Sequence, residues 1–406
     1  MGRLHTWLGA ARRSRRAWVL AAALVLALAG AGGALLATRT PTPAPRSQTP
    51  STRAIALGDS VPYGHGLHNP YLTPQVGLPE SWVSQGPSAL AYPSRVAAAL
   101  GLTMSVRATN CDLTGDQLAV SGAVADSADN TSPDGQCPHP PGPARNLSDE
   151  ITAADLAQHP ARLVLLQDGA DDIRFASCLE HELARVPVLG TNLDIGTQCV
   201  VNGAVTPALA AELADVRASL ARAIETVAPQ AGRVVVLDYY QPIPSPAQIG
   251  GGASAPTLHT NLVCAGLKDD PGPTYTAAQV VLGALNTAIA GAVTDARSAH
   301  VTNVVLVDLA SSFDGHGVCT ADPWVFSGEP VPDTTLAAVA EHVLAAKACN
   351  ETKVLHGATP CAPLVAQAQQ AEQQLTAYVW RAVHPTATGQ AAIATAVLHQ
   401  LHGRAA

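Results

Sequence analysis

The stretches LVLLQ (163–167), VVVLD (234–238) and VVLVD (304–308) carry apolar residues at consecutive positions. A strand with one buried face alternates apolar and polar residues, whereas a strand that is covered on both faces is apolar throughout. These stretches therefore predict strands of a parallel sheet with helices on both sides, which places the chain in the α/β class.

Further elements extend this pattern in both directions along the chain. Strands are expected at 53–57, 104–108, 162–167, 233–239 and 301–308, and helices at 92–100, 207–227, 276–299, 335–348 and 387–401. Strands that alternate with helices form a doubly wound sheet, in which functional sites lie beyond the carboxyl ends of the strands. The residues that directly follow the apolar runs are therefore the candidates for a site.

The N-terminal region has the composition of a targeting segment. Residues 1–37 hold five Arg and no acid, and the 21 residues from 17 to 37 are uncharged, long enough to span a bilayer. A signal sequence cleaved near 27–29, an uncleaved membrane anchor and a weak twin-arginine signal at 14–18 all fit, and each puts the rest outside the cytoplasm. We expect a Pro/Thr-rich linker at 38–51 and one folded domain at 52–406.

The composition excludes wholesale disorder and disfavours one class of partner. The chain of 406 residues is 47% hydrophobic and 13% charged, against about 25% charged in a typical soluble protein. Outside residues 1–37, 18 basic and 31 acidic residues give a net charge of −13. That excess of acid opposes binding to a phosphate backbone, so no nucleic acid partner is expected.

Eight cysteines in an exported chain indicate disulfides rather than metal sites, because no pair has the CxxC spacing of zinc ligands. Neighbours along the chain would pair as Cys111–Cys137, Cys178–Cys199, Cys264–Cys319 and Cys349–Cys361. This connectivity is one of many that the sequence allows, and spacing alone does not select it.

Three segments at the ends of expected elements carry the residues of a nucleophilic hydrolase. GDS (58–60) follows the first strand, where a tight turn can expose Ser60 with its own N–H directed at a carbonyl oxygen. GADD (169–172) follows a central strand, and HPTATG (384–389) opens the last helix with His384, a candidate base. Each segment alone is also typical of an ordinary turn or a surface histidine, but together they favour a catalytic site.

With these segments the chain resembles the SGNH (GDSL) hydrolase superfamily of esterases and lipases, over about residues 53–401. GDS matches the first block of that family, and LAVSGA (118–123) is similar to the block that supplies a glycine. The third block, normally Gly-x-Asn-Asp, reads GADD here, and the fifth, normally Asp-x-x-His-Pro, reads RAVHP (381–385). The resemblance implies a three-layer α/β/α flavodoxin-like fold with a central, mainly parallel five-stranded sheet.

The resemblance also implies roles for individual residues. Ser60 would be the nucleophile and His384 the general base, with an oxyanion hole formed by the N–H groups of Ser60 and Gly122 and, weakly, by Asp171. The segment FDGHGVC (313–319) is similar to one in secreted bacterial lipase-like members. That branch has disulfides at comparable places, which supports the first three sequential pairs and leaves Cys349–Cys361, in an insertion, to the count alone.

Asp171 departs from the family pattern, because it stands where the family has an oxyanion-hole asparagine. An ionised carboxylate only accepts hydrogen bonds and would repel the developing oxyanion. The hole therefore needs either a protonated Asp171 or the N–H groups of Ser60 and Gly122 alone.

Arg381 is a further departure, because it stands at the position of the triad acid and has no acceptor for His384. We expect the backbone carbonyl of Arg381 to accept the hydrogen bond from Nδ1, which would make the site a Ser60–His384 dyad. Asp314 and Asp322 are the side chains that could replace it.

These expectations combine into a serine esterase or lipase that acts outside the cytoplasm without a metal or organic cofactor. Its partner would be an ester substrate (a lipid, an acylated glycan or a small ester), and the membrane as well if the N-terminal segment is uncleaved. The alternative is a catalytically inactive cell-surface binding protein that retains the fold.

Overall fold

The computed structural model describes residues 51–67, 88–105, 119, 146–184, 198–249, 263, 264, 267, 271–327, 341, 342, 345, 349, 363, 364, 367 and 382–403. These belong to one compact unit, Ser51–Ala406. Residues 1–50 and Gly122 lie outside the described residues, so the targeting segment, most of the linker and the glycine-supplying block stay predictions.

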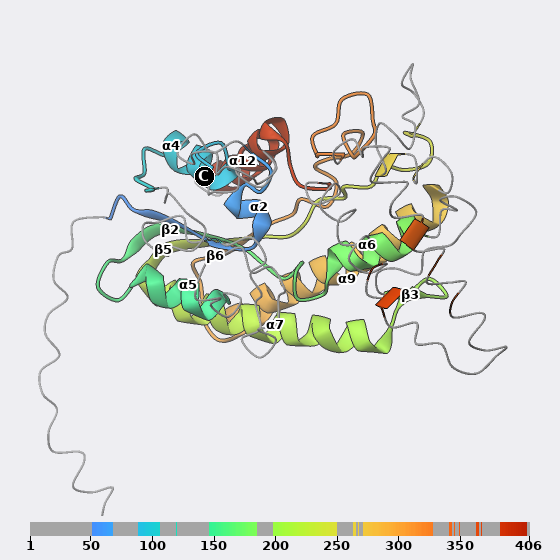
Figure 1. The fold of residues 1–406 in the computed structure, drawn as a ribbon. Helices are drawn as coiled ribbons and strands as arrows, with labels where there is room; N and C mark the ends of the chain where they lie inside the picture. Colours follow the sequence, from blue (N-terminus) through green and yellow to red (C-terminus); the bar gives the residue numbers. More distant parts are fainter. Residues whose placement is uncertain are drawn as a thin grey trace, which may run out of the picture. The chain divides into compact units, whose positions relative to one another are not determined.

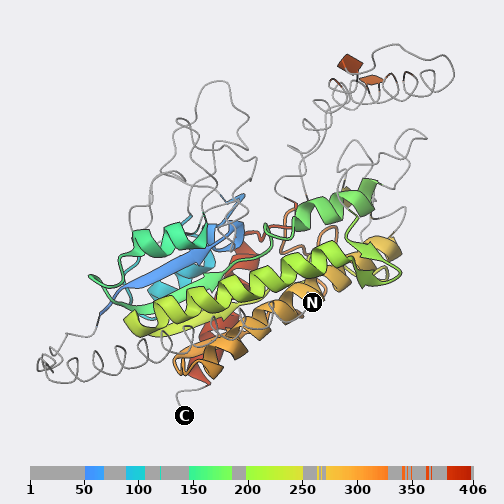
Figure 2. The same ribbon diagram turned by 90° about the horizontal axis from the view of Figure 1, so that it is seen from below.

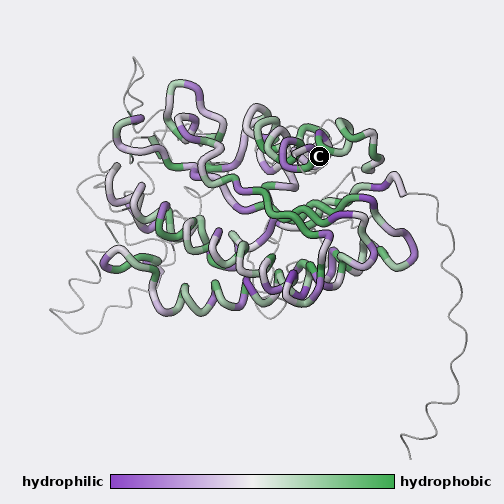
Figure 3. The backbone as a smooth tube through the Cα atoms, turned by 180° about the vertical axis from the view of Figure 1, so that it is seen from behind, coloured by the Kyte–Doolittle hydropathy of each residue, from purple (hydrophilic) through white to green (hydrophobic). Residues whose placement is uncertain are grey.

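The centre of the fold is a parallel sheet in the order β1-β2-β5-β6. Its strands are β1 (Ala54–Gly58), β2 (Ala161–Gln167), β5 (Ala231–Leu237) and β6 (Val304–Val307). All but one residue of β2 are buried, as the apolar run predicts. In Figure 3 these strands are the most hydrophobic part of the described residues. The α/β class and the mainly parallel sheet are therefore confirmed.

No strand is observed at the described residues of the stretch 104–108, where we expected one. Thr103 forms an isolated parallel bridge with Arg53, and the Ala54 N–H donates to the Thr103 carbonyl at 2.8 Å. Met104 and Ser105 are not in a strand, and residues 106–108 lie outside the described part of the chain. The described residues thus contain four strands of this sheet and a bridge at the outer edge of β1.

Helices cover both faces of the sheet, which gives the three layers that the sequence predicts (Figures 1 and 2). One face carries α4 (Tyr92–Ala99) and α12 (Ala387–His402), which pack on each other. The opposite face carries α5 (Leu147–Ala154), α7 (Pro207–Val227) and α9 (Pro271–Ser298). The bounds of α7 match the prediction because Thr206 caps the helix and Pro207 begins it.

Several elements were not predicted from the sequence. They are the helices α5 and α6 (Phe175–Ala184), the two-stranded pair β3 (Val200–Val201) and β4 (Ala204–Val205), and the 3-10 turn η1 (Ala228–Gln230). The N-cap of α5 is Asn146, whose side chain accepts the Asp149 N–H. Asparagine is a preferred N-cap residue, so the sequence does carry a signal for the start of this helix.

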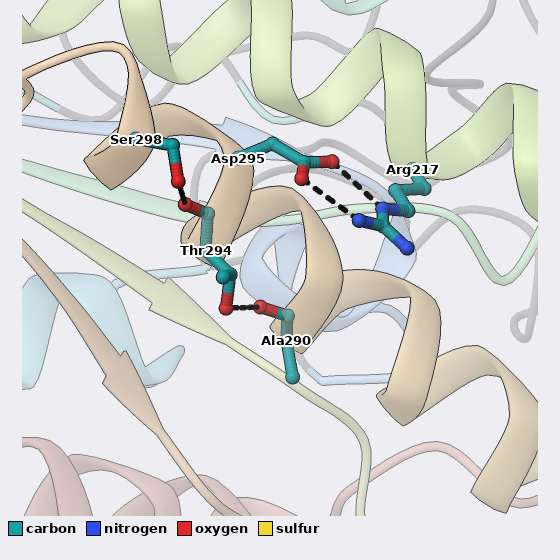
Figure 4. Close-up of polar contacts among 5 residues, drawn as sticks. All are labelled: Arg217, Ala290, Thr294, Asp295 and Ser298. Carbon is teal, nitrogen blue, oxygen red and sulfur yellow. Dashed lines mark hydrogen bonds and ion pairs between the residues drawn. The ribbon is translucent and has the colours of Figure 1, made fainter.

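Helix α9 is long and apolar enough to cross a membrane by length and composition. An 18-residue window of it has a mean hydropathy of 1.5, and half of this window is buried in the protein. Arg217 of α7 donates through two nitrogens to the Asp295 carboxylate at 2.7 and 2.8 Å (Figure 4). On the same helix, the hydroxyls of Thr294 and Ser298 donate to the carbonyls of Ala290 and Thr294. Leu285, Ile289 and Ala292 of α9 are fully buried, so α9 is a helix of the core that packs on α7.

Two of the expected disulfides are present. Cys178 is joined to Cys199, with Cα atoms 5.4 Å apart, and Cys264 to Cys319, with Cα atoms 5.5 Å apart. Cys349 is disulfide-bonded to a cysteine outside the described residues. The remaining cysteines, Cys111, Cys137 and Cys361, also lie there, so their pairing stays a prediction.

Candidate active site

The turn after β1 presents Ser60 at the start of a short helix, α2 (Ser60–Tyr63). Gly58 has a φ of 121°, and a Cβ there would lie 1.9 Å from the Gln167 carbonyl oxygen, so the turn requires glycine. Asp59 is the N-cap, and its Oδ1 accepts the Val61 N–H at 3.0 Å. As the first helical residue, Ser60 has an N–H without an intrahelical acceptor, which leaves this donor available to a bound oxyanion.

The structure brings Ser60 and His384 together. The Nε2 atom of His384 lies 2.8 Å from Ser60 Oγ, although the two residues are 324 positions apart. The His384 loop is held by the Phe326 N–H, which donates to the His384 carbonyl at 2.8 Å, and by the Tyr240 hydroxyl, which donates to the Val383 carbonyl at 2.7 Å. The candidate base and the candidate nucleophile are thus within hydrogen-bond distance of each other.

Arg381, whose carbonyl we expected to accept from His384 Nδ1, lies outside the described residues, so that contact stays a prediction. Among the described residues, Nδ1 contacts the Ala382 carbonyl oxygen, at 3.2 Å. The reason is Val383, whose φ of 66° turns the chain so that the carbonyl two residues before the ring faces it. A β-branched residue with positive φ is rare and strained. A proton on Nδ1, donated to this carbonyl, would leave Nε2 to accept the Ser60 hydroxyl hydrogen.

The two carboxylates that could have replaced the triad acid are placed elsewhere. Asp314 is exposed. The Asp322 carboxylate lies 3.3 Å from His316 Nδ1, and the Asp322 carbonyl lies 2.9 Å from the same atom. His316 stacks on Trp324 with ring centroids 3.7 Å apart. His316 therefore stabilises this loop.

Buried carboxyl groups gather beneath the nucleophile turn, and the sequence did not single them out. Asp59, Asp168 and Glu150 are at most 1% exposed. Glu150 Oε2 accepts the Gly58 N–H at 2.7 Å, and Asp168 Oδ1 accepts the Gly169 N–H at 2.8 Å. The other Asp168 oxygen has no hydrogen-bond partner among the described residues.

Burial raises the pKa of two of these carboxyl groups. It raises the pKa of Asp59 to about 7, and it raises the pKa of Asp168 well above its usual value. The half-buried Asp171 lies close enough for its charge to raise the pKa of Asp168 further.

Two more side chains complete the surroundings of the dyad. The Tyr239 hydroxyl, just beyond β5, donates to Asp59 Oδ2 through a short hydrogen bond and accepts the Ala170 N–H at 3.3 Å. His65 is 1% exposed, and its ring centroid lies 4.5 Å from that of His384. Tyr239 is the last residue of the strand expected at 233–239, and this place at the carboxyl end of a strand was the signal that could have identified it.

The burial of Asp238, which directly follows β5, makes the stability of the fold depend on pH. It is 5% exposed, its Oδ1 accepts the Leu309 N–H, and burial raises its pKa from 3.8 to about 7. Between these values the folded protein binds more protons than the unfolded chain. The contribution of Asp238 to the free energy of unfolding therefore falls as the pH rises from about 4 to about 7, and it stays lowered above that range.

Asp238→Asn is expected to raise the free energy of unfolding by about 2–4 kcal/mol at pH 8, because each pKa unit corresponds to about 1.4 kcal/mol. Near pH 4 the change should be small, because asparagine can still accept the Leu309 N–H. Urea unfolding at both pH values measures the difference, with Asp215→Asn on the exposed side of α7 as control. Equal effects at the two pH values would contradict the prediction.

No group of three or more His, Cys, Asp or Glu side chains that could hold a metal ion occurs in the part of the chain that the structure describes.

Comparison with known proteins yields weak structural likenesses. No family model and no curated protein matches the chain. Among solved structures, the extracellular lipase from Streptomyces rimosus is 18% identical, with a TM-score of 0.38 over 86% of this chain and 100% of the lipase. An acetylxylan esterase from Geobacillus stearothermophilus is 14% identical, with a TM-score of 0.33 over 86% of this chain and 93% of the esterase. These likenesses are too weak to assign a family.

Proposed function

We propose that this protein is a serine esterase or lipase that hydrolyses carboxylic esters through an acyl-enzyme on Ser60. The observation that supports this function most is the contact of 2.8 Å between Ser60 Oγ and His384 Nε2, with Nδ1 facing a backbone carbonyl. The resemblance of the GDS and HP segments to SGNH hydrolases supports the same reaction.

The first half of the reaction forms the acyl-enzyme. His384 Nε2 takes the Ser60 hydroxyl proton as Oγ attacks the ester carbonyl carbon, and the carbonyl oxygen becomes an oxyanion. The Ala382 carbonyl accepts the Nδ1 hydrogen and holds the imidazole in the required tautomer. When the tetrahedral intermediate collapses, the bond to the leaving oxygen breaks, and the Nε2 proton passes to that oxygen to release the alcohol.

The other half of the reaction regenerates the enzyme. A water molecule gives a proton to His384 Nε2 and attacks the acyl carbon. The collapse of this new intermediate breaks the bond to Ser60 Oγ, which recovers its proton from Nε2. The products are a carboxylic acid and the free serine.

The oxyanion hole is expected to depend on backbone donors. The Ser60 N–H and the Gly122 N–H would serve, and Asp171 would add a donor only when protonated. The loss of one such donor costs about 10²–10³ in rate in other enzymes, so a hole without the asparagine still permits slow turnover.

Substrate and location follow from the same proposal. A lipid, an acylated glycan and a small ester all carry the bond that this dyad would cleave. Disulfides persist in oxidising compartments, so Cys178–Cys199 and Cys264–Cys319 support a place outside the cytoplasm.

Labelling with a fluorophosphonate tests the proposal, because capture requires an activated serine. We expect labelling of the parent protein and its loss in Ser60→Ala. Ser298→Ala is the matched control, because Ser298 lies on the exposed end of α9 and donates to the Thr294 carbonyl. A folded parent that is not labelled would favour the inactive binding protein instead.

A further inference from the structure

Two consecutive tyrosines lie just beyond β5 and bond the residues that precede Ser60 and His384. The Tyr239 hydroxyl donates to Asp59, the residue before Ser60. The Tyr240 hydroxyl donates to the carbonyl of Val383, the residue before His384. Both tyrosines are 4% exposed, so each hydroxyl acts where water does not compete with it.

We propose that Tyr239 and Tyr240 are positioning residues that hold the Ser60 turn and the His384 loop at hydrogen-bond distance from each other. The proposal rests on the proposed function, because it assigns these tyrosines a role in that reaction. Their hydroxyls bond Asp59, Ala170 and Val383. Both act on the residue that precedes a catalytic side chain.

On the serine side, one hydroxyl joins the ends of three strands. Tyr239 follows β5, Asp59 follows β1 and Ala170 follows β2, and the Tyr239 oxygen both donates to the Asp59 carboxylate and accepts the Ala170 N–H. The other Asp59 oxygen is taken by the Val61 N–H, which fixes the first turn of α2. Removing the Tyr239 hydroxyl leaves a buried carboxylate oxygen without this donor and frees the turn that carries Ser60.

On the histidine side, the hydroxyl secures the strained peptide beside the ring. Val383 has the positive φ that turns the Ala382 carbonyl towards His384 Nδ1. Tyr240 bonds the Val383 carbonyl, and its ring stacks on Phe313 with centroids 4.1 Å apart. Strain of this kind persists only where the surroundings hold it, so loss of the hydroxyl loosens the Nδ1 acceptor.

The charge of Asp59 distinguishes the two tyrosines. Burial raises the pKa of Asp59 to about 7, while the Tyr239 hydrogen bond acts in the opposite direction. Tyr239→Phe therefore raises this pKa further, and a higher pH is needed to ionise Asp59. The titratable groups that act on Asp59 or share its buried surroundings are Glu150 of α5, Asp168, Asp171 and Asp172 after β2, Tyr92 of α4, Tyr239 and Tyr240 after β5, and His65 and His384 at the dyad.

The test compares three tyrosine-to-phenylalanine variants of the full chain with p-nitrophenyl acetate as substrate. Tyr239→Phe and Tyr240→Phe are each expected to lower kcat about 10- to 100-fold, the cost of a small misplacement of catalytic groups. KM should stay within about twofold of the parent value, because ground-state binding is unchanged. Tyr275→Phe is the control, because the Tyr275 hydroxyl lies on α9 and accepts from Gln279 Nε2 of the same helix at 2.6 Å. It should leave kcat unchanged.

The pH profile separates positioning from a general loss of structure. The ionised Asp59 carboxylate accepts from Val61 and Tyr239 and so holds the turn that carries Ser60. In Tyr239→Phe this carboxylate forms only at higher pH, so the acidic limb of kcat should move to higher pH. Tyr240→Phe should lower kcat without moving the limb. Asp59→Asn removes the titrating group, so the addition of Tyr239→Phe to it should produce no further shift. This pair keeps the test decisive if Tyr239→Phe alone folds poorly.

Two outcomes would overturn the inference. Tyrosine variants that turn over as fast as the parent, with the parent's pH profile, would overturn it and leave the esterase intact. A parent protein that reacts with no fluorophosphonate would overturn the proposed function and the inference with it.

Discussion

Ser60→Ala is expected to lower kcat/KM for p-nitrophenyl acetate by about 10⁴-fold or more, because removal of the nucleophile of an acyl-enzyme mechanism leaves only binding and the oxyanion hole. The fold should survive. Ser60 is partly exposed at the first position of α2, where alanine is tolerated, and the change removes a single hydrogen bond, to His384, worth about 1 kcal/mol.

Ester hydrolysis and urea unfolding, measured on the same preparation, check both halves of this prediction. Ser298→Ala should retain the parent rate. Residual turnover of Ser60→Ala within tenfold of the parent would remove Ser60 from the mechanism, whatever the labelling experiment shows.

His384→Ala is expected to lose nearly all activity, about 10³-fold or more, because no other base contacts Ser60 Oγ among the described residues. Asp314→Asn and Asp322→Asn should each keep most of it. Asp314 is exposed and Asp322 faces His316, whereas Nδ1 of His384 faces the Ala382 carbonyl. A dyad held by the main chain is insensitive to the loss of one carboxylate.

Initial rates of ester hydrolysis by the three folded variants decide between a dyad and a triad. A hundredfold loss in either aspartate variant would restore a triad with a relocated acid. Full activity in His384→Ala would remove the base altogether.

The elements with a local cause were predictable. The strands of the sheet were visible because both of their faces are buried, and α7 because Thr206 and Pro207 mark its start. Helix α5 was missed although the Asn146 side chain caps its start.

The candidate site divides in the same way. Ser60 and His384 lie in short segments that the sequence displays directly, and their catalytic roles stay predictions. The Ala382 carbonyl was not predictable, because valine rarely adopts the positive φ that Val383 has. In the sequence Glu150 is an acidic residue with no distinguishing feature. Only the tertiary fold brings its carboxylate to the Gly58 N–H, which donates to it.

The docking of α12 on α4 has a consequence for the biogenesis of the protein. Gln390 of α12 accepts the Tyr92 N–H at 2.7 Å and donates to the Val61 carbonyl at 3.0 Å, so the last described helix anchors the turn that carries the nucleophile. A chain emerging from the ribosome, or threading through an export channel, holds Ser60 long before it holds His384. The nascent polypeptide therefore carries no assembled dyad until its final segment has been made and has docked.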